Sequence, residues 1–106
     1  MANWAKAATQ HFAGKNIFWE MYNEPNIGFW KPSPNTTAYV LMSNAVGAAI
    51  SDNEIFFGPA SSQIDLSFLE DCFAMGTLQY WDAVSVHPYR QKDPETVQSE
   101  YYNLRR

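Results

Sequence analysis

The segment "NTTAYVLMSNAVGAAI", residues 35–50, decides the fold because it predicts a long helix between two short apolar strands. Asn35 or Thr36 can cap this helix, and an apolar stripe recurs at helical spacing after the cap. The stripe consists of Ala38, Leu41, Met42, Ala45, Val46, Ala49 and Ile50. A helix between two strands implies a right-handed crossover, so we expect the strands to run parallel.

Three short apolar segments predict the strands, and they lie near residues 16–23, 55–58 and 83–87. Capping and periodicity predict a helix before, between and after them. These further helices are residues 3–13, a helix capped by Asp65 that ends near Gly76, and a helix opened by Asp93-Pro94-Glu95 with Val97, Tyr101 and Leu104 as its buried face. The predicted order is α-β-α-β-α-β-α in one unit of residues 1–106.

Two α/β architectures fit this order, a doubly wound open sheet and a segment of a (β/α)8 barrel. No glycine-rich phosphate loop follows any of the strands, which weakens the nucleotide-binding form of the open sheet. In a barrel the chemistry lies at the C-terminal ends of the strands. Polar residues gather at those ends, as Asn23-Glu24, Ser61-Ser62 and His87-Pro88-Tyr89.

The composition favours a folded chain, with 46% hydrophobic and 16% aromatic residues. The net charge is −4, and Arg105-Arg106 is the one basic cluster, so we do not expect a nucleic-acid partner. The single cysteine, Cys72, lies in an apolar helical pattern and is expected to be a buried small hydrophobe. No apolar run could span a membrane and no signal peptide begins the chain. The sequence predicts a soluble chain and leaves its location open, including secretion.

Two glutamates interrupt the aromatic stretch "FWEMYNEPN", residues 18–26. Pro25 disfavours a helical backbone at the preceding residue, so we expect Glu24 to be extended at the strand tip. Strand alternation places Glu20 and Glu24 on one face, toward the interior of a barrel. A buried carboxylate at Glu20 would need a hydrogen-bond partner or a raised pKa.

This stretch resembles the end of the fourth strand in glycoside hydrolases of clan A. These enzymes are (β/α)8 barrels and include family 5 cellulases and mannanases and family 39 xylosidases. In the clan, the glutamate of the Asn-Glu-Pro motif is the general acid/base, and the asparagine before it binds the sugar 2-hydroxyl. The resemblance implies that Glu24 is the acid/base and that Asn23 binds the 2-hydroxyl.

A second stretch, "DAVSVHPYR" at residues 82–90, resembles the sixth strand of the same clan. The resemblance implies that His87 bounds the sugar site and that Tyr89 lies near the catalytic carboxylates. Between the two motifs, "FFGPASS" is similar to the fifth strand, which makes Ser61 and Ser62 weaker pocket candidates. The similarity therefore runs from the third to the sixth helix of a barrel.

The clan's chemistry is retaining hydrolysis of β-linked oligosaccharides or polysaccharides, and it needs no metal or organic cofactor. It uses two carboxyl groups roughly 5 Å apart, and the acid/base needs a raised pKa. The resemblance places the nucleophile at the end of a seventh strand, which we expect beyond Arg106. We therefore interpret the chain as about half of a barrel. A cellulase-like family 5 enzyme is our first choice for the parent barrel, and a family 39-like enzyme is our second.

Two other interpretations remain open. Three parallel strands leave two open edges and one uncovered face, so we expect the isolated chain to form a homo-oligomer. We expect negligible turnover unless this assembly supplies another carboxylate near Glu24. The chain would then be an inactive half-barrel that self-assembles. Alternatively it binds carbohydrate without catalysis, with Trp30, in the loop after Glu24, stacking on a sugar ring. The same Trp30 could instead pack beneath its neighbouring loop.

Overall fold

The computed structural model describes residues 1–106 and contains four α-helices and three strands. In chain order these are α1 (Ala2–His11), β1 (Phe18–Glu20), α2 (Thr36–Ala49), β2 (Ile55–Ser62), α3 (Leu66–Ala74), β3 (Ala83–His87) and α4 (Val97–Leu104). Two 3₁₀ turns, η1 (Thr77–Gln79) and η2 (Pro94–Thr96), precede β3 and α4. The predicted alternation of helices and strands is confirmed. None of the helices is both long and apolar enough to cross a membrane.

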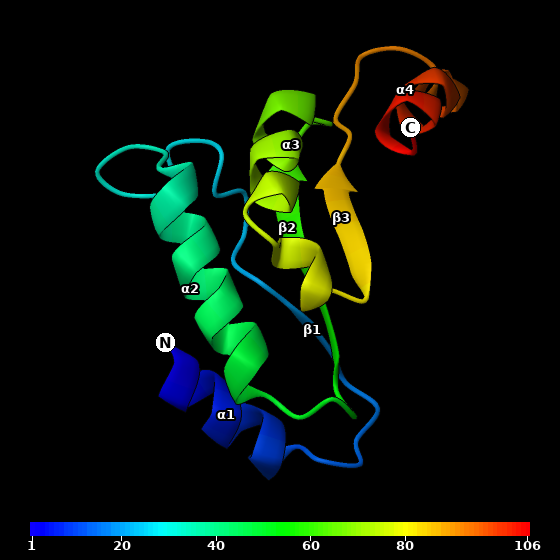
Figure 1. Ribbon diagram of the computed structural model, residues 1–106. Coiled ribbons are helices and arrows are strands. Elements are labelled where there is room, and N and C mark those ends of the chain that lie inside the picture. The colour runs from blue at the N-terminus through cyan, green and yellow to red at the C-terminus, as the bar shows by residue number, and fades with distance from the viewer.

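The strands form one open, all-parallel sheet in the order β1-β2-β3, as in part of a β/α barrel (Figure 1). β3 has the predicted bounds, whereas β1 is shorter than predicted and β2 is longer. β1 is short because Asn16 and Tyr22, on either side of it, have left-handed backbones with φ of 56° and 45°. β2 continues through Gly58-Pro59, where the sequence predicted a stop.

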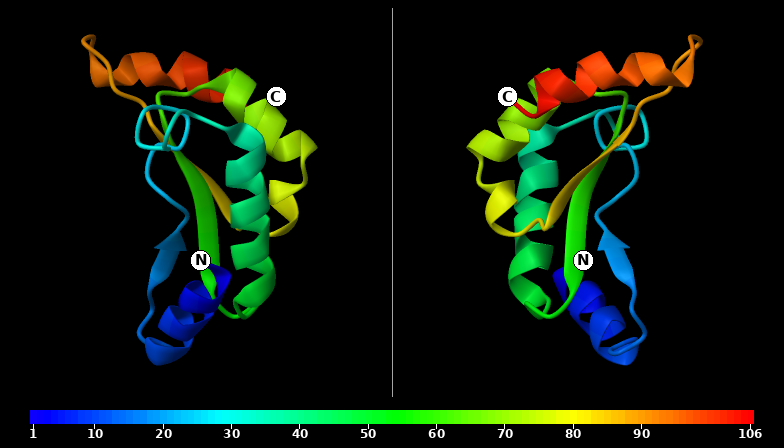
Figure 2. Two further views of the ribbon diagram at one scale, coloured as in Figure 1. Left: turned by 90° about the vertical axis from the view of Figure 1, so that its left-hand side faces the viewer. Right: turned by 90° about the vertical axis from the view of Figure 1, so that its right-hand side faces the viewer.

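The helices leave one face of the sheet uncovered. Figure 2 shows α2 and α3 along one face of the strands and no helix along the opposite face, since α4 crosses beyond the ends of the strands. Since side chains alternate along a strand, Trp19, Phe56 and Val84 belong to the side that packs with the helices. On the opposite side, Phe18 and Ile55 are paired neighbours and are 66% and 41% exposed. The sheet therefore has a core on one side only.

The core joins α1, α2, α3 and the sheet through a cluster of nine buried residues. They are Ala5, Met21, Tyr39, Val40, Val46, Phe56, Phe68, Cys72 and Trp81. The Trp81 indole N–H donates to the Ser43 hydroxyl over 3.0 Å, which satisfies the buried indole. Burial raises the pKa of the Cys72 thiol to about 12, as expected for a packed, unreactive cysteine.

The predicted apolar stripe of α2 is partly wrong. The buried residues of this helix are Tyr39, Val40, Ser43 and Val46, whereas Leu41 is 65% exposed. α2 carries apolar residues around most of its circumference, so their periodicity alone does not select the face that packs on the sheet.

The predicted helix starts are confirmed at two of three places. Side-chain oxygens of Asn35 and Asp65 accept hydrogen bonds from backbone N–H groups three residues later, over 2.9 and 3.1 Å. Asp93 makes no such bond, and its carbonyl instead accepts from the Thr96 hydroxyl over 2.7 Å. α4 has no fully buried residue, and on its predicted buried face Val97 and Leu104 are half-buried whereas Tyr101 is 39% exposed, so this prediction is only partly confirmed.

The turn after α1 depends on a glycine. Gly14 has φ of 77°, and a Cβ built there would meet no atom within 4 Å. We predict that Gly14→Ala lowers the free energy of unfolding by about 1 kcal/mol, because only the left-handed backbone penalises the added methyl group. Urea unfolding followed by tryptophan fluorescence measures this change.

Gly28→Ala is the matched control, since a Cβ there also meets no atom within 4 Å and φ is not left-handed. We expect this variant to be neutral or slightly stabilising. Equal destabilisation by the two substitutions would contradict the conformational explanation.

Candidate active site

A carboxylate and an imidazole meet at the C-terminal edge of the sheet. Glu24 follows β1, His87 ends β3, and Glu24 Oε1 lies 2.9 Å from His87 Nδ1. Glu24 is buried, with 5% of its surface exposed, and His87 is half-buried. Because all three strands are parallel, their C-terminal ends share one edge, and two residues 63 positions apart come into contact.

A bulge in β2 positions the backbone of Glu24. The pairing of β2 with β3 shifts register between Pro59 and Ser61, and the intervening Ala60 has φ of 53°. The Ala60 carbonyl accepts from the Glu24 N–H over 3.0 Å, and the Ala60 N–H donates to the Ser85 hydroxyl over 2.9 Å. Sequence reasoning missed this role, although a proline inside a strand is a signal of a bulge.

Asn26 fastens the loop that carries Glu24 to the end of β2. Its side-chain amide donates to the Ser62 carbonyl over 2.9 Å and to Asp65 Oδ2 over 3.1 Å. Its side-chain oxygen accepts from the Ser62 N–H over 2.9 Å. The last residue of the Asn-Glu-Pro-Asn motif is therefore a positioning residue, a role that the sequence analysis did not assign.

The extended backbone predicted for Glu24 is wrong, since its φ is 48°. The hydrogen bond to Ala60 and the fastening of Asn26 outweigh the local preference set by Pro25. A left-handed backbone costs a residue with a side chain about 1–2 kcal/mol. Ala60 and Gln63 are also left-handed, and such strained residues cluster at functional sites.

The surroundings of Glu24 favour its ionised form. The hydrogen bond with His87 lowers the pKa of Glu24 below its ordinary value of 4.5, against the opposing effect of burial. The Tyr89 hydroxyl adds a smaller lowering, and the carboxylate in turn raises the pKa of Tyr89. Glu24 and Tyr89 do not form a hydrogen bond within the usual limits of length and angle, so His87 is the principal partner of the Glu24 carboxylate. Glu24 therefore does not have the raised pKa that the resemblance implied for an acid/base.

The other predicted site residues differ in their surroundings. Tyr89 is exposed, and its ring meets the His87 ring edge-on, with centroids 6.0 Å apart. Asn23 is exposed and makes no side-chain hydrogen bond within the chain, so its amide is available to a ligand. Trp30 is half-buried and packs edge-on against the rings of Tyr22 and Tyr39, with centroids 5.2 and 5.8 Å away.

Ser61 and Ser62 take part in the backbone framework of the site. The buried Ser61 hydroxyl donates to the Gln63 carbonyl over 2.7 Å. The backbone of Ser62 is bound by Asn26 at both its N–H and its carbonyl. These serines support the edge of the sheet beside the Glu24–His87 pair.

The hydrogen-bond partner expected for Glu20 is absent. The Glu20 side chain is exposed and makes neither a hydrogen bond nor an ion pair. Glu20 follows Trp19 in β1, and because side chains alternate along a strand, the Glu20 side chain points to the uncovered side of the sheet. Since no other part of the structure covers that side, the Glu20 carboxylate remains hydrated and needs no hydrogen-bond partner.

Hollows in the surface do not by themselves identify the site. An open hollow of about 370 Å³ lies against Val86, His87, Pro88 and Tyr89. Two larger hollows of about 540 Å³ lie near the start of β1 and between β3 and α4, and neither is lined by Glu24. The buried carboxylate and its imidazole partner therefore define the candidate site.

No protein-family model, curated protein or solved structure matches this chain. The function of the site must accordingly be argued from its residues and geometry.

We predict that His87→Phe raises the pKa of Glu24, because the substitution removes the strongest group that lowers it and leaves burial in place. A carbon-13 NMR titration of the Glu24 carboxyl group measures this change. In the parent chain, a lowered pKa means that ionised Glu24 stabilises the fold above pH 4.5, and this contribution is lost as the pH falls through the folded-state pKa. The variant should lose that pH dependence.

His11→Phe is the matched control, because His11 is exposed on α1 and the chain has only two histidines. We expect this variant to leave the titration of Glu24 unchanged. A Glu24 pKa that is the same in His87→Phe as in the parent chain would show that the 2.9 Å contact does not control the carboxylate.

Proposed function

We propose that this chain carries the acid/base part of a retaining glycoside hydrolase site for β-linked glycans, of the cellulase-like clan A type. The observation that supports this most strongly is the buried Glu24 carboxylate, held 2.9 Å from His87 at the C-terminal edge of a parallel β/α sheet. Barrel enzymes place their chemistry at this edge. The free amide of Asn23 and the exposed ring of Tyr89 lie beside the carboxylate on the same chain segments.

The proposed reaction needs a second carboxylate. A nucleophile attacks the anomeric carbon while Glu24 protonates the departing oxygen, and water then hydrolyses the glycosyl intermediate with Glu24 as base. In this chain, His87 and Tyr89 both stabilise ionised Glu24. A second anion close by would disfavour the ionised form and raise the pKa toward the range that an acid requires. The isolated chain is thus proposed to supply one of two catalytic groups.

We predict negligible hydrolysis of phenyl β-cellobioside by the isolated chain, and a rate that rises when formate is added. Formate would attack the anomeric carbon in place of the missing nucleophile, as the phenolate oxygen takes the proton of Glu24. Water then releases formate and the sugar. The measurement is phenol release with and without formate, at a pH low enough to protonate part of Glu24.

Glu24→Gln is the control, because it keeps the shape of the side chain but cannot transfer the proton. We expect no effect of formate on this variant. Equal formate-dependent rates in the two proteins, or none in either, would refute the proposed role of Glu24. Strong activity without formate would instead show that assembly supplies a second carboxylate.

A second candidate function is self-assembly of an inactive half-barrel. The uncovered face of the sheet presents Phe18 and Ile55 side by side, and both outer strands have an unpaired edge. Exposed apolar surface and open edges both favour association. We propose that copies of this chain associate through this face and these edges, which is compatible with a glycosidase origin.

We predict that the parent chain forms oligomers at micromolar concentration and that Phe18→Lys weakens them by about tenfold or more, since burial of a phenylalanine contributes about 2 kcal/mol. Light scattering over a range of concentrations measures the change. Leu41→Lys is the matched control, because Leu41 is equally exposed but lies on α2. A stable monomer, or equal effects of the two substitutions, would contradict association through the uncovered face.

A further inference from the structure

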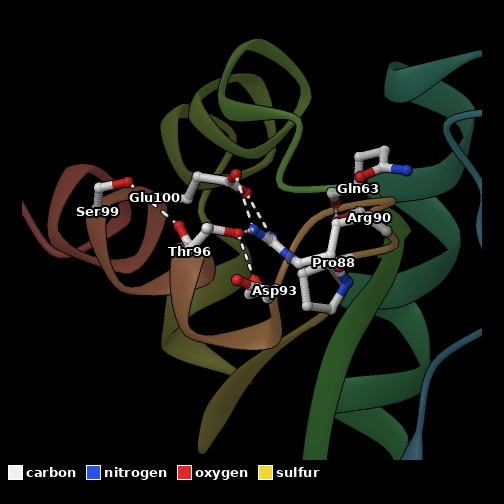
Figure 3. Close-up of polar contacts among 8 residues, drawn as sticks. Gln63, Pro88, Arg90, Asp93, Thr96, Ser99 and Glu100 are labelled. Atoms are coloured by element: carbon white, nitrogen blue, oxygen red, sulfur yellow. Dashed lines mark hydrogen bonds and ion pairs between the residues drawn. The ribbon is translucent and has the colours of Figure 1, made fainter.

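Arg90 makes four hydrogen bonds just after the site (Figure 3). Its Nε donates to the Pro88 carbonyl over 3.1 Å, and its Nη1 donates to the Thr96 hydroxyl over 3.0 Å. Both terminal nitrogens reach the Glu100 carboxylate, over 3.2 and 2.9 Å. A two-pronged contact of this kind fixes both the distance and the plane of the guanidinium group.

These contacts link α4 to the turn that carries His87 and Tyr89. Glu100 lies in α4 and Thr96 in the 3₁₀ turn before it, whereas Pro88 lies between the two site residues. Figure 2 shows α4 lying across the end of the molecule, beyond the C-terminal ends of the strands. Because α4 buries no residue, packing alone holds it weakly, and the Arg90 contacts are its best-defined polar attachment.

We propose that Arg90 is a positioning residue for the Glu24–His87 pair, held in place by Glu100 and Thr96 and acting through the Pro88 carbonyl. The turn that contains Pro88 connects Arg90 directly with the backbone of His87. The His87 carbonyl accepts from the N–H groups of Gln63 and Tyr89, over 3.0 and 2.8 Å. With Pro88 fixed by Arg90, the backbone on the C-terminal side of His87 has one arrangement, and the imidazole stays directed at Glu24.

The burial of the Arg90 side chain supports this role. The Arg90 side chain is only 14% exposed, whereas the Glu100 side chain is 46% exposed, so the guanidinium end of the contact is partly removed from water and its carboxylate end remains hydrated. Arg90 forms no side-chain hydrogen bond with Glu24 or His87, so any effect that it has on the Glu24–His87 pair is transmitted through the backbone of the turn. The inference concerns the geometry of the site and does not depend on the proposed hydrolase activity.

The decisive experiment is a carbon-13 NMR titration of Glu24 in the variant Glu100→Gln. Removal of a negative charge would, through direct electrostatics, lower the pKa of Glu24 or leave it unchanged. Loss of positioning would weaken the contact with His87 and raise the pKa toward 4.5. We expect the rise, and the opposite signs separate a positioning role from a simple charge effect. A lower or unchanged pKa would overturn the proposal.

Three further variants complete the test. Glu95→Gln removes a charge from the same segment at an exposed residue without a side-chain contact, and it should not raise the pKa of Glu24. Arg90→Lys keeps the charge but loses the two-pronged contact, so it should raise the pKa as Glu100→Gln does. Thr96→Val removes one contact without a change of charge and should give a smaller rise. If Arg90→Lys and Thr96→Val both leave the titration unchanged, Arg90 is only a tether for α4.

Discussion

The parallel pairing of β2 with both of its neighbours governs the arrangement of the helices, the core and the candidate site. It brings the ends of β1 and β3 to one edge, although the residues that meet there are 63 positions apart. Parallel strands need crossover connections, and here the connecting helices α2 and α3 lie on a single side of the sheet. The same constraint therefore builds the Glu24–His87 contact and leaves the opposite face of the sheet without cover.

Backbone contacts between segments that are distant in the chain position the carboxylate of the candidate site. The β2 bulge at Ala60 and the amide of Asn26 hold Glu24 in a left-handed backbone that its neighbours in sequence disfavour. This arrangement directs the carboxylate at His87, whose hydrogen bond lowers the pKa of Glu24. A carboxylate so stabilised is ready to act as a base or to bind a hydrogen-bond donor. A proton donor at neutral pH would need one more negative charge nearby.

The two weakly covered parts of the molecule differ in how they are stabilised. The uncovered sheet face exposes aromatic and aliphatic side chains to water, so burial against another surface would stabilise it. The last helix instead holds its place through a charged contact between Arg90 and Glu100, because it buries little apolar surface. That charged contact adjoins the turn of His87, which connects the position of α4 with the geometry of the site.

Local sequence patterns predict the order of helices and strands, the caps at Asn35 and Asp65, and the gathering of Glu24 and His87 at strand ends. These features follow from signals read over a few residues, namely periodicity, capping oxygens and prolines. Three features arise only in the folded chain, namely the left-handed backbone of Glu24, its lowered pKa and the face of α2 that is buried. Each of these depends on groups that are distant in the chain, such as the Ala60 carbonyl and the His87 ring. Their contact energies outweigh the local preferences that a sequence pattern records.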